Sequence, residues 1–112
     1  MRRAILVAVG CLCMAKGPAW GYASLTDGNE LHRLCNSNSA GDKQACVYYI
    51  RGAFDMMSSL GNLSDRICVS EDVQLGQLKS VVEIWLHDHP EKWHWTAAFI
   101  VETALKEKFP CN

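Results

Sequence analysis

The sequence lacks the short motifs that identify common catalytic centres. It contains no Gly-x-Ser-x-Gly nucleophile elbow, no glycine-rich phosphate-binding loop and no His-Glu-x-x-His zinc motif. Its carboxylates do not suggest an acid–base pair either, because Asp55 and Glu83 are single acidic residues on predicted helices. We therefore expect no catalytic residue, and an enzyme is the weakest of the functional classes.

Strand patterns and chain-breaking residues are also scarce. No segment alternates apolar and polar residues over a length that predicts a β-strand. Of the three prolines, Pro18 follows the N-terminal apolar run, Pro90 precedes the last periodic segment and Pro110 ends it. The chain also contains no internal repeat, low-complexity tract or interdomain linker. These absences predict a single all-α domain.

The one long apolar run lies at the N-terminus. Arg2 and Arg3 precede the segment from Ala4 to Ala15, which is too short to span a bilayer comfortably. Small residues then lead up to Ala23, as a signal peptidase requires, although Ala19 with Gly21 offers a second cleavage site. We expect residues 1–23 to be a signal peptide and residues 24–112 to be the mature domain. An uncleaved membrane anchor and a lipoprotein acylated at Cys11 are the alternatives.

Cleavage of the signal peptide makes the chain acidic. It leaves 8 basic against 12 acidic residues, a net charge of −4. Nucleic-acid binding requires a basic face, so we expect no nucleic-acid partner. No second apolar segment is long enough to cross a membrane. The sequence therefore predicts a soluble protein of an oxidising compartment, most simply the bacterial periplasm.

Four amphipathic segments predict four helices, because apolar residues recur along each at steps of three and four. The expected helices begin after Asp27, after Asp42 as a cap, at Ser70 and at Pro90, and they end near 36, 60, 87 and 109. Gly52 lies inside the second, where glycine costs about 1 kcal/mol relative to alanine. We expect a neighbouring helix to approach closely there.

Four cysteines remain after the signal peptide, which takes Cys11 and Cys13 with it; they are Cys35, Cys46, Cys68 and Cys111. An even number in a small exported protein predicts disulfides. Short connections make consecutive helices antiparallel, so only the pairs Cys35–Cys46 and Cys68–Cys111 join residues at the same end of an up-down bundle. A zinc site is disfavoured, because no two cysteines have the close spacing of structural zinc motifs. We expect no metal and no cofactor.

Histidines and tryptophans gather around the predicted turn into the last helix. Trp93 and Trp95 would lie about 200° apart on a helix, so both cannot face one core. Trp93 fits the buried stripe, whereas Trp95 is either partly exposed or packed on the first helix or on residues 63–69. We expect His87, His89, His94 and Trp95 to be candidates for partner binding. A surface metal site and a merely solvated turn are alternatives for the histidines.

The order of these residues resembles the Rap/Tai-type immunity domain family. The shared positions are Leu34-Cys35, Cys46, Tyr49, Gly52, Asp55, Ile67-Cys68-Val69, Gln77-Leu78, Val81, Val82, Leu86, His89-Pro90, Ala98, Val101, Ala104-Leu105 and Phe109-Pro110-Cys111. The resemblance implies a periplasmic helical protein that occludes the active site of a cognate peptidoglycan amidase delivered by type VI secretion, often as a homodimer. One departure is Ser70, where the family often has proline.

The shared positions are mostly apolar residues and cysteines, so the resemblance indicates the fold better than the partner. A different class of function therefore stays open. The alternative is a general small periplasmic helical protein, of the stress or chaperone-like kind, with no toxin partner.

Overall fold

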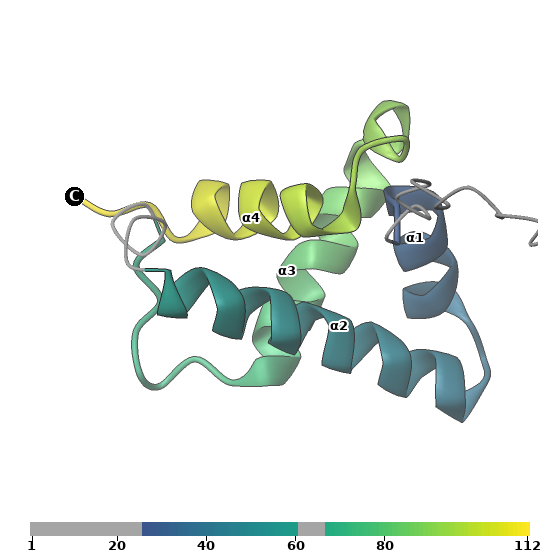
Figure 1. Cartoon of the computed structure of the whole chain (residues 1–112), viewed down its shortest axis with the longest axis horizontal. Helices are drawn as coiled ribbons and strands as arrows, with labels where there is room; N and C mark the ends of the chain where they lie inside the picture. The colour runs from purple at the N-terminus through teal and green to yellow at the C-terminus, as the bar shows by residue number, and fades with distance from the viewer. Residues whose placement is uncertain (1–25, 61–66) are drawn as a thin grey trace, which may run out of the picture.

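The computed structural model describes residues 26–60 and 67–112, so the predicted signal peptide lies outside the described residues. This part contains α1 (Gly28–Asn36), α2 (Ala40–Ser59), α3 (Leu75–Asp88), the short 3-10 helix η2 (Pro90–Lys92) and α4 (Ala97–Lys108). In Figure 1, α2 and α4 extend in the same direction, α3 crosses them, and α1 lies at one end. The described residues form no strand, and the prediction of an all-α four-helix bundle is confirmed.

The start of α1 agrees with the predicted cap, whereas the start of α2 does not. The Asp27 carboxylate accepts the Glu30 N–H at 2.9 Å, as an N-cap does. Helix α2 begins at Ala40, before the predicted position, and Ser39 caps it by accepting the Asp42 N–H. The prediction that Asp42 caps the second helix was therefore wrong. The earlier serine captures that N–H and leaves the Asp42 carboxylate in the first turn, where the helix dipole favours negative charge.

The predicted start of the third helix at Ser70 was also wrong, since α3 begins at Leu75. The Ser70 hydroxyl lies 2.5 Å from Asp72 Oδ1, and its carbonyl accepts the Val73 N–H, so local bonds hold this segment in a turn. Gln74 and Gln77 form the capping box instead, with the Gln74 N–H donating to Gln77 Oε1 at 2.7 Å. The side-chain bonds of the turn compete with the helix and delay its start.

The fourth helix likewise begins later than expected, because Pro90 starts η2 and α4 begins only at Ala97. The intervening backbone bonds to the chain at the start of α1. The N–H groups of Gly28 and Asn29 donate to the carbonyls of Trp95 and Trp93, at 2.9 and 3.0 Å, and the Ala97 N–H donates to Thr26 at 2.8 Å. These bonds to another element replace the helical bonds that residues 93–96 would otherwise make.

The core is a single apolar cluster to which all four helices contribute. Its buried members are Leu31, Cys35, Cys46, Ile50, Met57, Leu78, Val82, Trp85, Leu86, Ala97, Ile100, Val101, Ala104 and Leu105. Each large aliphatic side chain contributes about 1.5–3 kcal/mol by leaving water. No polar or charged residue of the described chain is buried. Gly52 is exposed, and a Cβ added there would have no atom within 4 Å. The prediction that a neighbouring helix of this chain packs closely against Gly52 was therefore wrong.

Both predicted disulfides are confirmed, with Cα–Cα distances of 5.1 Å for Cys35–Cys46 and 5.0 Å for Cys68–Cys111. The first is buried between α1 and α2. The second joins the C-terminus to the segment before α3, where Cys68 N–H also donates to the Phe109 carbonyl. Sequence separations of 11 and 43 residues correspond to about 3 and 4 kcal/mol in the loop-entropy model. Among the described helices, none has the length and apolarity needed to cross a membrane.

Candidate partner-binding surface

A continuous row of rings crosses the junction between α3, η2 and α4. We call it the aromatic corner, and its members are Trp85, His89, Lys92, Trp95 and Phe99. The His89 ring stacks on Trp85 with centroids 4.2 Å apart, Trp85 lies 6.2 Å from Trp95, and Trp95 lies 5.0 Å from Phe99. Lys92 Nζ lies 4.4 Å from the Trp95 ring centroid, within cation–π distance. Trp85 is buried, only 7% exposed, so the accessible part of the corner consists of His89, Trp95 and Phe99, with the Lys92 cation at its edge.

The first helix holds this corner in place. Besides the bonds from Gly28 and Asn29 to the turn, the His32 ring stacks on Trp93 at a centroid distance of 3.9 Å. Trp93 Nε1–H donates to the Leu86 carbonyl at 2.8 Å, which ties the turn to α3 as well. Trp93 thus anchors the turn between α1 and α3. Trp95, two residues further on, directs its ring onto Trp85 and Phe99 and stays half-buried.

The predicted partner-binding residues divide into two groups. His89 and Trp95 belong to the corner, and exposed His94 touches its edge, with ring centroids 6.4 Å from Trp95. His87 lies outside the corner, 86% exposed, with Nδ1 3.1 Å from an Asp88 oxygen. His89 Nδ1 lies 2.8 Å from the Trp85 carbonyl, which only accepts, so this nitrogen carries the proton. Within the described residues the three histidines do not form a group of metal ligands.

A hollow of about 260 Å³ lies beside the corner, between α3 and α4. It is lined by Val81, Ile84, Trp85, Asp88, His89, Ala104, Glu107 and Lys108. Trp85 Nε1–H donates to Glu107 Oε2 at 3.0 Å, and Ile84 is 62% exposed. Apolar surface surrounded by charged groups is typical of the pocket that receives an anchor side chain in a protein interface. The hollow is smaller than the usual 300–1,000 Å³ of small-molecule sites.

A second apolar surface was missed by the sequence reasoning. Tyr48, Gly52, Met56 and Leu60 follow one another at four-residue steps along α2, and we call this stripe the α2 face. Its three side chains are 55–60% exposed, and Phe99 of α4, 49% exposed, lies beside a hollow of about 240 Å³ that Met56 and Leu60 also line. The four-residue repeat, offset from the buried stripe, was the signal in the sequence. Helical periodicity from Cys46 to Leu60 predicts Leu60 to be buried, and that prediction was wrong, because Leu60 is 55% exposed.

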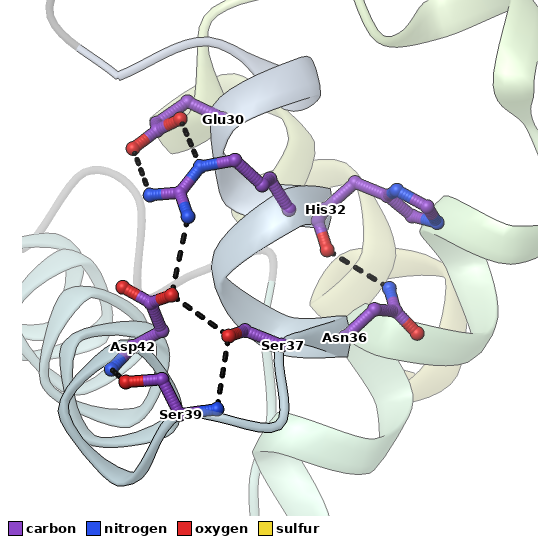
Figure 2. Close-up of polar contacts among 7 residues, drawn as sticks. Glu30, His32, Asn36, Ser37, Ser39 and Asp42 are labelled. Atoms are coloured by element: carbon purple, nitrogen blue, oxygen red, sulfur yellow. Dashed lines mark hydrogen bonds and ion pairs between the residues drawn. The ribbon is translucent and has the colours of Figure 1, made fainter.

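Charged side chains join α1 to α2 away from the corner. The Arg33 guanidinium donates to both Glu30 and Asp42, and Figure 2 shows these two carboxylates on the neighbouring helices. The Arg33 guanidinium lowers the pKa of Glu30, and the bond from Ser37 Oγ, at 2.7 Å, followed by Arg33, lowers the pKa of Asp42. Both carboxylates raise the pKa of Arg33. Burial between α2 and α4 raises the pKa of Tyr49 because it disfavours the phenolate.

Comparison with known proteins gives one family. A family model described as Rap1a immunity proteins matches residues 27–111, which is most of the chain. The match begins at the Asp27 cap and ends at Cys111, so it includes both disulfides and the aromatic corner. No curated protein and no solved structure matches.

Proposed function

The chain belongs to the Rap1a immunity protein family, and we propose that it neutralises a peptidoglycan amidase of type VI secretion by occluding the enzyme's active site. Family membership itself implies an immunity protein that binds a secreted toxin, a non-catalytic role that such proteins typically perform outside the cytoplasm. The amidase, the secretion route and the periplasmic location extend the Rap/Tai resemblance of the sequence. They are the parts of the proposal that need direct tests.

The aromatic corner is the observation that best supports binding as the mode of action. Tryptophan is enriched among the residues that dominate interface energies, and aromatic side chains lose little entropy on binding. The Trp95 ring already contacts the rings of Trp85 and Phe99, and the bond from Gly28 of α1 holds the Trp95 backbone. Such a preorganised surface avoids much of the ordering cost of association. We therefore assign the toxin-facing surface to the corner and its adjacent hollow.

Trp95 gives the direct test of this assignment. The Trp95→Ala variant is expected to weaken toxin binding by at least 2 kcal/mol, about 30-fold in Kd, because it removes the central ring of the corner. Tyr48→Ala, another exposed aromatic but on the α2 face, is the matched control and should bind normally. Binding is measured by calorimetry with any peptidoglycan amidase that is encoded beside this chain, and protection by survival of cells that express both.

The outcomes separate the surface from the function. If folded Trp95→Ala binds as tightly as the parent protein, the corner is the wrong surface although the immunity function stands. If the exported parent protein neither binds the amidase nor prevents lysis, the amidase proposal itself is wrong. Circular dichroism of each variant establishes that the fold is intact before binding is compared.

We also infer that the protein forms a homodimer through the α2 face. Two antiparallel α2 helices that cross at Gly52 would place Tyr48 of each copy beside Met56 of the other. Gly52 has nothing within 4 Å of its added Cβ, so a second helix can approach its backbone closely. Arg51 and Asp55, both at least 60% exposed and only loosely paired at 3.8 Å, would then face each other reciprocally across the twofold axis.

The size of this surface predicts a weak dimer. The three large side chains of the α2 face, each about half exposed, offer on the order of 350 Å² per subunit, compared with about 800 Å² in a standard interface. Either single reversal, Arg51→Glu or Asp55→Arg, should dissociate the dimer in analytical ultracentrifugation. The double variant should restore it, whereas Lys106→Glu on α4 should have no effect. A double variant as monomeric as the single ones would contradict this arrangement.

A further inference from the structure

Two cysteines and a carboxylate from three different helices meet at one end of the core. Cys35 of α1, Cys46 of α2 and Glu83 of α3 place their sulfur and oxygen atoms within 4.8 Å of one another. We propose that the dithiol form of the protein, through which each chain passes before its disulfides close, binds a thiophilic divalent cation such as Zn²⁺ at these three residues. Within the described chain they form the single such group of possible ligands.

The positions of the three donors are compatible with zinc. The two sulfurs are bonded to each other in the disulfide form. Tetrahedral zinc with bonds of about 2.0–2.3 Å requires donors roughly 3.5–3.8 Å apart, so the reduced sulfurs must move apart, and side-chain rotations on Cα atoms 5.1 Å apart allow this. Cys35 is 6% exposed and Cys46 is fully buried, while the Glu83 side chain is 28% exposed. Water therefore has access to the fourth coordination position from the Glu83 side. Two thiolates with a carboxylate favour zinc over the hard cations magnesium and calcium.

Lys79 neutralises the net charge of the proposed metal site. Two thiolates and one carboxylate carry −3, so the site with Zn²⁺ carries −1, and Lys79 Nζ lies 2.5 Å from Glu83 Oε1. The ammonium neutralises that excess and occupies one carboxylate oxygen, which leaves the other for the metal. Binding breaks no covalent bond between heavy atoms and transfers no electron. Each thiol loses its proton to solvent as its sulfur bonds to the cation, so two protons leave for each ion bound.

The spacing of these ligands explains why the sequence disfavoured zinc. Cys35 and Cys46 are not close in sequence, and Glu83 comes from a different helix, so no short motif connects them. The fold supplies the proximity instead, through the packing of α3 against α1 and α2. A bound ion would join these three helices before oxidation. It would also slow closure of the Cys35–Cys46 disulfide, because the thiolate lone pairs would be engaged by the metal.

The test titrates the phosphine-reduced protein anaerobically with Cd²⁺, observes thiolate-to-metal charge-transfer absorption, and then competes with Zn²⁺. The parent protein and Cys68→Ser/Cys111→Ser should bind one ion. Cys35→Ser/Cys46→Ser should bind none at this site. Glu83→Gln should bind about 10- to 100-fold more weakly, as expected when a carboxylate ligand is lost. Glu91→Gln, an exposed glutamate of η2, is the matched control and should bind like the parent protein.

Folding of the reduced protein provides a second readout. Far-ultraviolet circular dichroism with and without Zn²⁺ should show that the metal increases helix content or its thermal stability, because the ion binds the folded arrangement. Cys35→Ser/Cys46→Ser should show no such gain. The proposal fails if the reduced parent protein binds no ion. It also fails if Glu83→Gln binds as tightly as the parent, or if the charge-transfer band persists in Cys35→Ser/Cys46→Ser.

Discussion

Two glycines of the described chain allow the same substitution to be tested in opposite environments. A Cβ added at Gly28 would lie 2.5 Å from Ile100 Cδ1 and 2.7 Å from the Cα and carbonyl oxygen of Trp93. The isoleucine methyl can rotate, but the Trp93 backbone is bonded to α1 and cannot move without stretching that bond. At exposed Gly52 the same methyl meets nothing within 4 Å. We therefore expect Gly28→Ala to destabilise the fold and Gly52→Ala to stabilise it.

The magnitudes follow from the two environments. Overpacking costs about 1–3 kcal/mol, and weakening the bonds from Gly28 and Asn29 to the turn adds about 1 kcal/mol. Because alanine recovers about 1 kcal/mol of helix propensity, Gly28→Ala should lose about 1–3 kcal/mol in total. Gly52→Ala should gain about 0.5–1 kcal/mol. With about 4–8 °C per kcal/mol for a domain of this size, Tm should fall by roughly 5–20 °C in the first variant and rise by several degrees in the second.

Thermal and urea denaturation followed by circular dichroism measure both changes, in dilute solution where the monomer predominates. Near-ultraviolet circular dichroism should also change in Gly28→Ala, because the turn that carries Trp93 and Trp95 is displaced, and should stay constant in Gly52→Ala. Shifts of the same sign in the two variants would refute the reasoning. So would a Gly28→Ala variant within 0.5 kcal/mol of the parent protein.

Three further outcomes follow from the disulfides and the charged network. A dithiol should reduce the Cys68–Cys111 bond before the buried Cys35–Cys46 bond, because Cys68 is exposed, and mass spectrometry of alkylated thiols checks the order. Equal rates would contradict this. The folded pKa values of Glu30 and Asp42 lie below their ordinary values of 4.5 and 3.8, so both residues stabilise the fold above those values. That stability is lost as pH falls through the folded pKa values. In urea denaturation at several acidic pH values, the free energy of unfolding of Asp42→Asn should therefore fall less steeply than that of the parent protein. An equally steep fall would show that the ion pairs of Arg33 with Glu30 and Asp42 do not contribute. Ser39→Ala should cost about 1 kcal/mol in the same assay, since it removes the α2 cap, and a loss no larger than for exposed Ser58→Ala would count against the cap.

The sequence predicted a structural feature correctly wherever no other hydrogen bond or contact competed with the local pattern. Asp27 capped the first helix as predicted, and the helix pattern with the cysteine positions gave the correct disulfides. Ser70 and Pro90 carry equally good start signals, yet neither begins an α-helix. At Ser70 a local bond to Asp72 forms a turn, and after Pro90 the carbonyls of Trp93 and Trp95 are bonded to α1 instead. The second competitor lies more than sixty residues away in sequence, so no local pattern reveals it.

The difference between local patterns and distant contacts also explains which residues of the aromatic corner could be predicted from the sequence. His89 and Trp95 were identified because they cluster in sequence near a turn. Helical periodicity predicts Trp85 to be buried, which is confirmed, and it packs against the Trp95 ring from the core side. Lys92 and Phe99 were missed, because each joins the surface only through its contact with the Trp95 ring. An interface assembled from several elements has no short motif, even when two of its five members are prominent in the sequence.

Helix α1 connects the stabilising bonds of the scaffold to this surface. Its C-terminal end carries Cys35, bonded to α2, and its N-terminal end donates to the carbonyls of Trp93 and Trp95 beneath the rings. A nine-residue helix is too short to be stable by itself in water. Its order therefore depends on contacts at both ends, and loosening either end should loosen the other. The aromatic corner is thus held by the Cys35–Cys46 disulfide through α1, although neither cysteine belongs to that surface.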